Sequence, residues 1–264
     1  MTFFSTIEPI YYLLPLAGLI VGLFGTILGG GGGFFFLPIL TLVIGAPAQT
    51  AVITSLVATL PICIVGAAMH YRKGNMDIRT GSVFAISGIL GAFAGAAIAN
   101  YIIPQLLKTI FGIYAVGIGG LMLMNVKQRR SDKTNKTFNK RRKPTNYLKK
   151  PAYGFLAGII TGTFGTSGTA PVLAGLFAAR LPVKMVIGTS LFVLVVNTSF
   201  AVGAHFLMGQ IDLTLVTLLT AGSIPGALLG PVILSNIKTE NSESSIKYVY
   251  ATVMVLIGIL MIIA

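Results

Sequence analysis

Charged residues are scarce in this sequence. Only 9% of its 264 residues are charged and 55% are hydrophobic, whereas a soluble domain has about 25% charged residues. The mean hydropathy is +0.89, and apolar segments recur from one end of the chain to the other. This composition excludes an ordinary soluble protein and predicts an integral membrane protein without a sizeable soluble domain.

Metal-ligating and reactive side chains are also rare. Cys63 is the only cysteine, so it can form no intramolecular disulfide or thiolate cluster, and its apolar neighbours indicate a small core residue. No group of cysteines and histidines has metal-ligand spacing, and no Walker-type Gly-x4-Gly-Lys-Ser/Thr sequence occurs. We therefore expect no cofactor, no metal and no ATPase activity of the chain's own.

Acidic residues are missing from the interior of the apolar segments. Without an intramembrane carboxylate, an ordinary proton relay or Na⁺ site is difficult to assemble. A neutral or anionic substrate is therefore favoured over a cation. The first twelve residues contain no Lys or Arg, unlike the start of a cleaved signal peptide, so we expect the first apolar segment to belong to the mature protein.

Positive charge is concentrated in one stretch. Residues 127–150 hold eleven of the nineteen Lys and Arg residues against one acid, Asp132. Such a stretch is a loop and not a folded basic face, so the net charge of +13 does not predict a nucleic-acid partner. Because basic loops favour the cytoplasmic side, we expect residues 126–150 to be cytoplasmic, close to anionic lipids, and the N-terminus to lie outside.

The apolar segments form two series of five. They run over 10–28, 34–44, 48–70, 80–99 and 105–125, and then over 152–164, 170–180, 184–207, 212–234 and 246–264. Most approach the ~20 residues of a spanning helix, but 34–44 and 170–180 are too short. Pro38 and Pro171 stand at or near their starts. We predict that these two segments are short or broken membrane helices.

An internal repeat relates the two series. Glycines recur 136 positions later, and after one deletion the offset is 135. The matching pairs include Gly18 and Gly154, Gly29 and Gly165, Thr54-Ser55 and Thr189-Ser190, His70 and His205, and Asp77 and Asp212. Because the only two histidines fall at one repeat position, we expect a duplication.

An odd number of crossings per repeat would invert the second repeat relative to the first, as is common among secondary transporters. The predicted fold is therefore an all-α integral membrane protein of two inverted-topology repeats, 1–125 and 151–264, joined by the loop 126–150.

A glycine-rich break precedes each short segment. Glycine lowers helix stability by about 0.8–1 kcal/mol relative to alanine, and exposed backbone groups are tolerated in a membrane only inside protein or beside water. The helix start after each break offers free N–H donors, which suit an anion. We predict substrate binding by Gly29, Gly30, Gly31, Gly32, Gly33, Phe34, Gly165, Thr166, Ser167, Gly168 and Thr169. Close helix packing through small residues is the alternative.

Other polar residues lie within or at the ends of the long segments. The hydroxyls of Thr54, Ser55, Thr189 and Ser190 either face the same centre or bond back to their own helices, and Asn197 is a candidate lining residue. By the predicted topology, the two histidines lie near opposite membrane faces, which disfavours a shared metal site.

Two further roles are expected at the helix ends. His70 and His205 are either gating or proton-linked residues, or interfacial caps. Asp77 and Asp212 are expected to cap the helices that follow them.

These features together resemble one family. Gly18–Leu40, its repeat partner Gly154–Leu173, the Thr-Ser pairs and the His-x3-Gly-Asn/Gln-x-Asp turns are similar to those of the TauE/SafE sulfite exporter family, over essentially the whole chain outside 126–150. The resemblance implies a multi-pass carrier, not an enzyme, in a bacterial or archaeal cytoplasmic membrane. It also implies a substrate such as sulfite or an organosulfonate, usually moved outward. Thr166, Ser167 and Thr169 depart from the glycine-dense family pattern, which bears on anion preference.

The sequence thus predicts a secondary transporter that exports a small sulfur-containing anion by alternating access. The alternatives are an uptake carrier for a carboxylate or an inorganic sulfur ion, a membrane-embedded enzyme, and a structural or signalling subunit that docks through the basic loop. Replacing Gly31 or Gly168 by Leu is expected to abolish transport while folding is largely retained.

Overall fold

The computed structural model describes residues 2–132, 150–166, 168–207, 211–236 and 240–264. Its first series of helices comprises α1 (Leu14–Ile27), α2 (Gly33–Pro38), α3 (Ala48–Arg72), α4 (Ile78–Tyr101) and α5 (Pro104–Asp132). The second comprises α6 (Lys150–Phe164), α7 (Thr169–Ala178), α8 (Val183–Phe206), α9 (Leu213–Asn236) and α10 (Glu240–Ile263). A 3₁₀ turn, η1 (Pro9–Leu13), leads into α1, and a π-helical turn, η2 (Ile39–Val43), continues α2.

The described helices confirm the all-α membrane fold. Six of them are long and apolar enough to cross a membrane, by length and composition. The helical stretches Gly33–Val43 and Thr169–Ala178 are shorter, as predicted for the two segments after the glycine-rich breaks. Each of these short helices begins at the end of its break.

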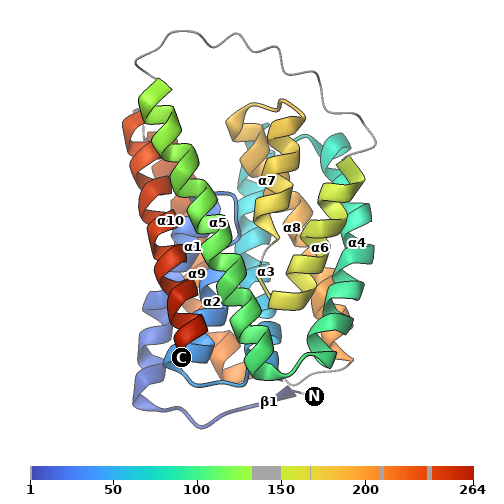
Figure 1. The fold of residues 1–264 in the computed structure, drawn as a ribbon, viewed down its shortest axis with the longest axis vertical. Helices are drawn as coiled ribbons and strands as arrows, with labels where there is room; N and C mark the ends of the chain where they lie inside the picture. Colours follow the sequence, from blue (N-terminus) through green and yellow to red (C-terminus); the bar gives the residue numbers. More distant parts are fainter. Residues whose placement is uncertain (1, 133–149, 167, 208–210, 237–239) are drawn as a thin grey trace.

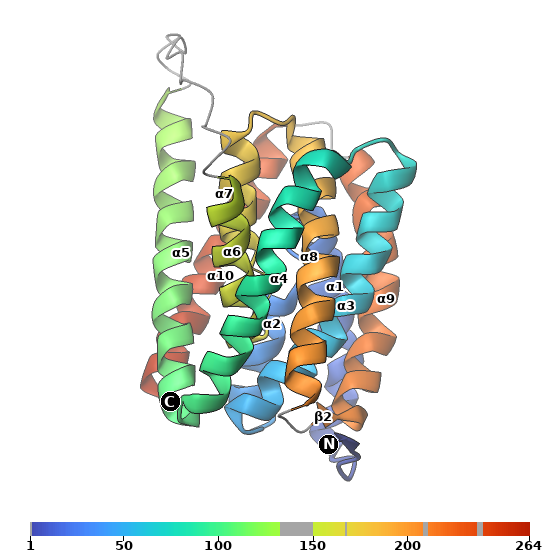
Figure 2. The same ribbon diagram turned by 90° about the vertical axis from the view of Figure 1, so that its right-hand side faces the viewer.

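The helix boundaries follow the repeat spacing. The starts of α6 and α7 lie 136 positions after those of α1 and α2 (150 − 14 and 169 − 33), and those of α8 and α9 lie 135 positions after those of α3 and α4 (183 − 48 and 213 − 78). Packing follows the same correspondence: α1 lies against α9 and α4 against α6, while α3 packs on α8 and α5 on α10. The α5–α10 pair stands at one edge of the bundle (Figures 1 and 2).

Both chain ends lie at the same end of the bundle, opposite the end of α5 and the start of α6 (Figure 1). The short strand β1 (Thr2–Phe3) pairs in parallel with β2 (Ile211–Asp212), just before α9. The N-terminus and the segment between α8 and α9 therefore share one side, the arrangement expected if each series makes five crossings.

The helix α5 is longer than the apolar segment at its start. It extends to Asp132, so residues 126–132, expected as the beginning of the basic loop, are helical. These residues include Lys, Gln and Arg and no Gly or Pro, and such residues propagate a helix readily in water. Residues 133–149, the remainder of the expected loop, lie outside the described part of the chain.

Glycines bring the paired helices into close contact. A Cβ on Gly158 of α6 would collide with the carbonyl of Gly88 on α4, and a Cβ on Gly22 of α1 would collide with the carbonyl of Ser223 on α9. Such small-residue contacts are typical of helix packing in membranes. Along these helices, the glycines are therefore explained by packing alone.

We predict that Gly158→Ala destabilises the protein by about 1–3 kcal/mol, because the added methyl meets backbone atoms that cannot rotate away. Thermal unfolding in detergent would measure this. The matched control is Gly117→Ala on α5, where a Cβ meets nothing within 4 Å. Equal melting temperatures for the two variants would contradict the packing assignment.

Candidate functional site

The first break is built from glycines in conformations that other residues rarely adopt. Gly29, Gly31 and Gly32 have φ angles of +71°, +63° and +74°, which lie in the left-handed region. Space is limited too, since a Cβ on Gly32 would lie 2.6 Å from Cγ1 of Val21 on α1. This break therefore requires glycine for both backbone conformation and packing.

The second break is also tightly enclosed. Gly165 has a φ of +62°, and a Cβ there would collide with the carbonyl of Val52 on α3. The N–H of Gly168 donates to Thr161 Oγ1 at 2.9 Å. Thr166 is buried, and Ser167 lies outside the described residues.

The expected behaviour of the leucine variants needs correction. A Cβ on Gly168 would collide with the carbonyl of Ala157 on α6, so a leucine there displaces α6 from the break. At Gly31, the positive φ makes any L side chain strained. Neither substitution leaves the fold largely intact, and neither can separate a loss of binding from a loss of structure.

The two breaks lie against each other, and hydrogen bonds cross between the two series there. Thr169 Oγ1, at the start of α7, donates to the carbonyl of Gly30 at 3.2 Å. From the neighbouring helices, Ser190 Oγ donates to the carbonyl of Gly29 at 2.8 Å, and Ser55 Oγ to that of Gly165 at 2.7 Å. Each serine belongs to one series and bonds the break of the other, so the two breaks are held reciprocally.

Each serine also approaches its own helix. Ser55 Oγ lies 2.8 Å from the carbonyl of Val52, and Ser190 Oγ lies 2.8 Å from that of Ile187. A hydroxyl has one hydrogen, so the two carbonyls share it. Both arrangements considered from the sequence, bonding to the helix and facing the centre, occur together at these serines.

The neighbouring threonines differ from the serines. Thr189 Oγ1 accepts a hydrogen bond from the N–H of Asp77 at 2.9 Å, so it holds the start of α4 rather than a break. Thr54 is fully buried, and its hydroxyl has no partner among the described residues. The structure therefore brings the serines to the breaks and places Thr189 elsewhere.

A set of buried polar side chains without partners lies on α3 and α8. Asn197 is fully buried, and neither Oδ1 nor Nδ2 has a hydrogen-bond partner in the described part of the chain. Its amide packs against Gly88 of α4. The hydroxyls of Thr59 and Thr198 are buried and unpartnered in the same way. The sequence analysis selected Asn197 but missed Thr59 and Thr198. The position of these polar residues inside apolar segments could have indicated them.

Aromatic rings connect the residues next to the two breaks. The Phe34 ring, which follows the first break, lies 5.2 Å from that of Phe111 on α5. Phe111 lies 5.7 Å from Phe164, the residue before the second break, and Tyr114 stacks on Phe164 at 5.6 Å. Phe34 is buried, so it is part of a packed cluster. The sequence analysis identified Phe34 but not its ring partner Phe111, which lies far away in the sequence.

The two histidines lie apart. His205 Nε2 is 2.6 Å from the carbonyl of Gly162 near the end of α6, whereas both ring nitrogens of buried His70 have no partner among the described residues.

Helix capping is confirmed at the two acids. Asp77 Oδ1 accepts from the N–H of Thr80 at 3.1 Å, and Asp212 accepts from the first turn of α9.

Removing a serine that bonds a break should leave a buried carbonyl without its donor. We predict that Ser190→Ala lowers the free energy of unfolding by about 1–3 kcal/mol, measured by thermal unfolding in detergent. Ser199→Ala is the control on the same helix, because Ser199 is exposed and bonds only the carbonyl of Val195. An equal effect at both positions would mean that the bond to Gly29 contributes nothing.

The cap at Asp77 should make stability depend on pH. Burial raises the pKa of this carboxyl, but hydrogen bonds from Thr80 and the charge of Lys150 outweigh it, so the pKa lies below its usual value. A lowered folded-state pKa gives a contribution that is complete above the ordinary pKa and is lost as pH falls through the folded-state value. We predict that Asp77→Ala costs about 1 kcal/mol at pH 7, and that unfolding curves of the variant and the parent converge in acid. A constant difference down to acid pH would contradict the capping role.

Comparison with known proteins identifies the family. The sulfite exporter TauE/SafE family model matches residues 14–261. A probable membrane transporter protein of Xylella fastidiosa is 29% identical over 264 residues, which cover 97% of this chain and 96% of that protein. The probable membrane transporter protein YdhB of Bacillus subtilis is 26% identical over 227 residues, with 84% and 87% of the two chains covered.

The similarity extends to archaea. A probable membrane transporter protein of Methanocaldococcus jannaschii is 29% identical over 188 residues, covering 69% of this chain and 67% of that protein. No solved structure matches the chain. The family model spans nearly the whole sequence, including both breaks and the helices around them. The chain is a multi-pass membrane transporter and belongs to the TauE/SafE sulfite exporter family.

Proposed function

We propose that this protein exports a small sulfur-containing anion, such as sulfite or an organosulfonate, by alternating access between its two repeats. The observation that carries the proposal is the reciprocal bonding of the breaks. Ser55 bonds the break of the second repeat, and Ser190 bonds that of the first. Two broken helices that meet inside a membrane protein are a common setting for substrate binding in secondary transporters.

The chemistry of the breaks suits an anion. Neither break contains an acidic side chain, and the helical stretches 33–43 and 169–178 both start there. Helix starts present N–H groups and a partial positive charge. Glycine allows a ligand to approach the backbone closely. An oxyanion of sulfur accepts hydrogen bonds from backbone N–H groups, and from the hydroxyl of Thr169 once its bond to Gly30 is broken.

The cross-repeat bonds support alternating access. Ser55, Ser190 and Thr169 each bond a carbonyl of the other repeat. If the second repeat is inverted relative to the first, a rocking motion between them breaks these bonds. A released hydroxyl can donate to the anion. In this scheme the serines hold the breaks together in one state and contact substrate in the next.

The unpartnered polar side chains support a second state. An unsatisfied buried polar group costs about 1–3 kcal/mol, and Thr59, Asn197 and Thr198 carry four such atoms. A conformation in which water or substrate reaches these side chains satisfies their polar atoms. A ligand that favours this conformation shifts the population toward it.

Export is the direction that needs no coupling ion. With the 126–150 loop in the cytoplasm, an anion leaving the cell moves down an inside-negative potential, which is worth about 2.3 kcal/mol per charge per 100 mV. The interior of the apolar segments lacks a carboxylate that could hold a coupling cation. The second candidate function is uptake of a carboxylate or of an inorganic sulfur ion. The polar residues of the second break favour this function.

We predict that purified protein in liposomes conducts sulfite outward under an inside-negative potential. In the same assay, Gly30→Ala should lower the flux about tenfold, equivalent to about 1.4 kcal/mol. A Cβ on Gly30 lies 3.3 Å from Thr169 Oγ1, so the methyl narrows the space between the breaks. The φ of Gly30 is not positive, unlike those of its neighbours, which makes alanine tolerable there.

Gly117→Ala is the matched control and should leave the flux unchanged. Sulfite flux that is equal in Gly30→Ala and the parent would refute the proposed site. If the protein carries acetate or thiosulfate instead of sulfite, and Gly30→Ala still reduces that flux, the proposed site stands but the proposed substrate is wrong. Flux that requires a pH gradient and runs inward would refute export.

A further inference from the structure

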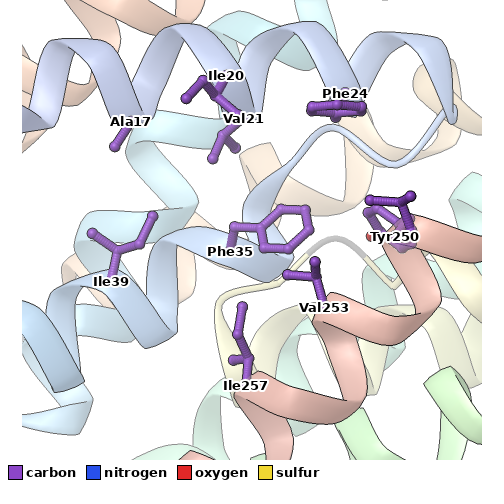
Figure 3. A pocket seen from close by; sticks show the side chains of 10 residues that line it. Ala17, Ile20, Val21, Phe24, Phe35, Ile39, Tyr250, Val253 and Ile257 are labelled. Carbon is purple, nitrogen blue, oxygen red and sulfur yellow. The ribbon is translucent and has the colours of Figure 1, made fainter. Parts of the chain in front are cut away.

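A cavity of about 300 Å³ lies behind the first break (Figure 3). One wall is α1, with Ala17, Val21 and Phe24, and the opposite wall is α10, with Val253 and Ile257. Phe35 and Ile39, at the beginning of the short helical stretch, also line it, and the aromatic rings of Phe24, Phe35 and Tyr250 gather at one end (Figure 3). The walls present only carbon to the cavity, so it cannot hold the anion proposed above.

The cavity is open toward the lipid-facing surface. Its lining residues Ile20 and Val249 are 46% and 56% exposed, and apolar residues beside them on both helices are exposed as well. These neighbours are Leu16 and Leu19 on α1, and Leu256 and Leu260 on α10. Both walls lie in apolar helical stretches, 9–27 and 248–263. The cavity is therefore a side groove of the surface that the hydrocarbon layer covers.

The short helical stretch turns one face into this groove. Between residues 31 and 40, only Phe35 and Ile39 are partly exposed, and the other eight residues are buried. Residues four apart share a helix face. The partial exposure of this face is thus exposure to the groove, which lies directly beside the helix that follows the first break.

The groove offers a short, continuous apolar path. From Ala17 to Phe24, the wall rises about 10.5 Å at 1.5 Å per residue. A hydrocarbon chain of the surrounding bilayer reaches this length from the open, lipid-facing side.

We propose that the groove between α1 and α10 binds one acyl chain of a bilayer lipid. The chain lies along the two helices, against Phe35 and Ile39, and ends at the aromatic rings of Phe24 and Tyr250. Carbon walls exclude an anion, and continuity with the lipid-facing surface gives the acyl chains of the bilayer direct access to the groove. The occupant touches the short helical stretch that follows the first break, but its binding does not depend on transport.

Tryptophan fluorescence tests this inference directly, because the chain contains no tryptophan. Phe35→Trp places a single reporter in the groove, and the protein is reconstituted into phosphatidylcholine with either brominated or unmodified acyl chains. Bromine quenches tryptophan on contact. Phe35→Trp should be quenched nearly as strongly as Leu260→Trp, which faces lipid with 55% exposure. Phe36→Trp, at the adjacent and fully buried position, should be quenched at least threefold less.

A blocking substitution completes the experiment. Ala17→Phe fills the groove, so it should reduce quenching of Phe35→Trp to the level of Phe36→Trp and leave Leu260→Trp unchanged. Tyr250→Trp provides a second groove reporter if Phe35→Trp does not give a monodisperse protein. The proposal would be overturned if both groove reporters were quenched no more than Phe36→Trp. It would also be overturned if Ala17→Phe left the quenching of both groove reporters unchanged. All measurements are made without an anion gradient, so they are independent of the proposed transport function.

Discussion

The hydrogen bonds that cross between the two series at the breaks are the constraint on which the rest of the structure depends. Inside a membrane, a carbonyl that has left its helix must find a donor within the protein. Gly29 and Gly165 each find it in a serine of the opposite series. Each break therefore depends on a long helix of the opposite series to satisfy its carbonyl, α8 for the first break and α3 for the second.

Glycine has two separate roles here. On α1, α6, α4 and α9 it allows backbones to approach closely, and a methyl group would collide with a neighbouring carbonyl. In the breaks, Gly29, Gly31, Gly32 and Gly165 adopt positive φ angles, so they end one helix and aim the next. The first role keeps the bundle rigid, while the second leaves backbone polar groups at its centre. A rigid frame around a polar break is what a membrane transporter needs.

Hydropathy and spacing were sufficient to predict the helices, the two short segments and the caps at Asp77 and Asp212, because these depend on local composition and periodicity. The hydrogen-bond and ring partners of individual residues could not be predicted in this way. Ser190 bonding Gly29, Thr189 bonding Asp77, and the ring of Phe164 on Phe111 join residues far apart in sequence. The helical extension to Asp132 was also missed, since it follows from helix propensity outside the membrane and not from hydropathy.

The pairing of α1 with α9 has a consequence for biosynthesis. Gly18 and Gly22 of α1 pack on Leu219 and Ser223 of α9, about 200 residues later in the chain. At a synthesis rate of about 5–20 residues per second, α9 is made roughly 10–40 s after α1. During that time, neither repeat can complete its own packing, because each supplies a helix to the other. Assembly of this protein is thus a late event, and a nascent chain cut short before α9 leaves an unpaired glycine face exposed in the bilayer.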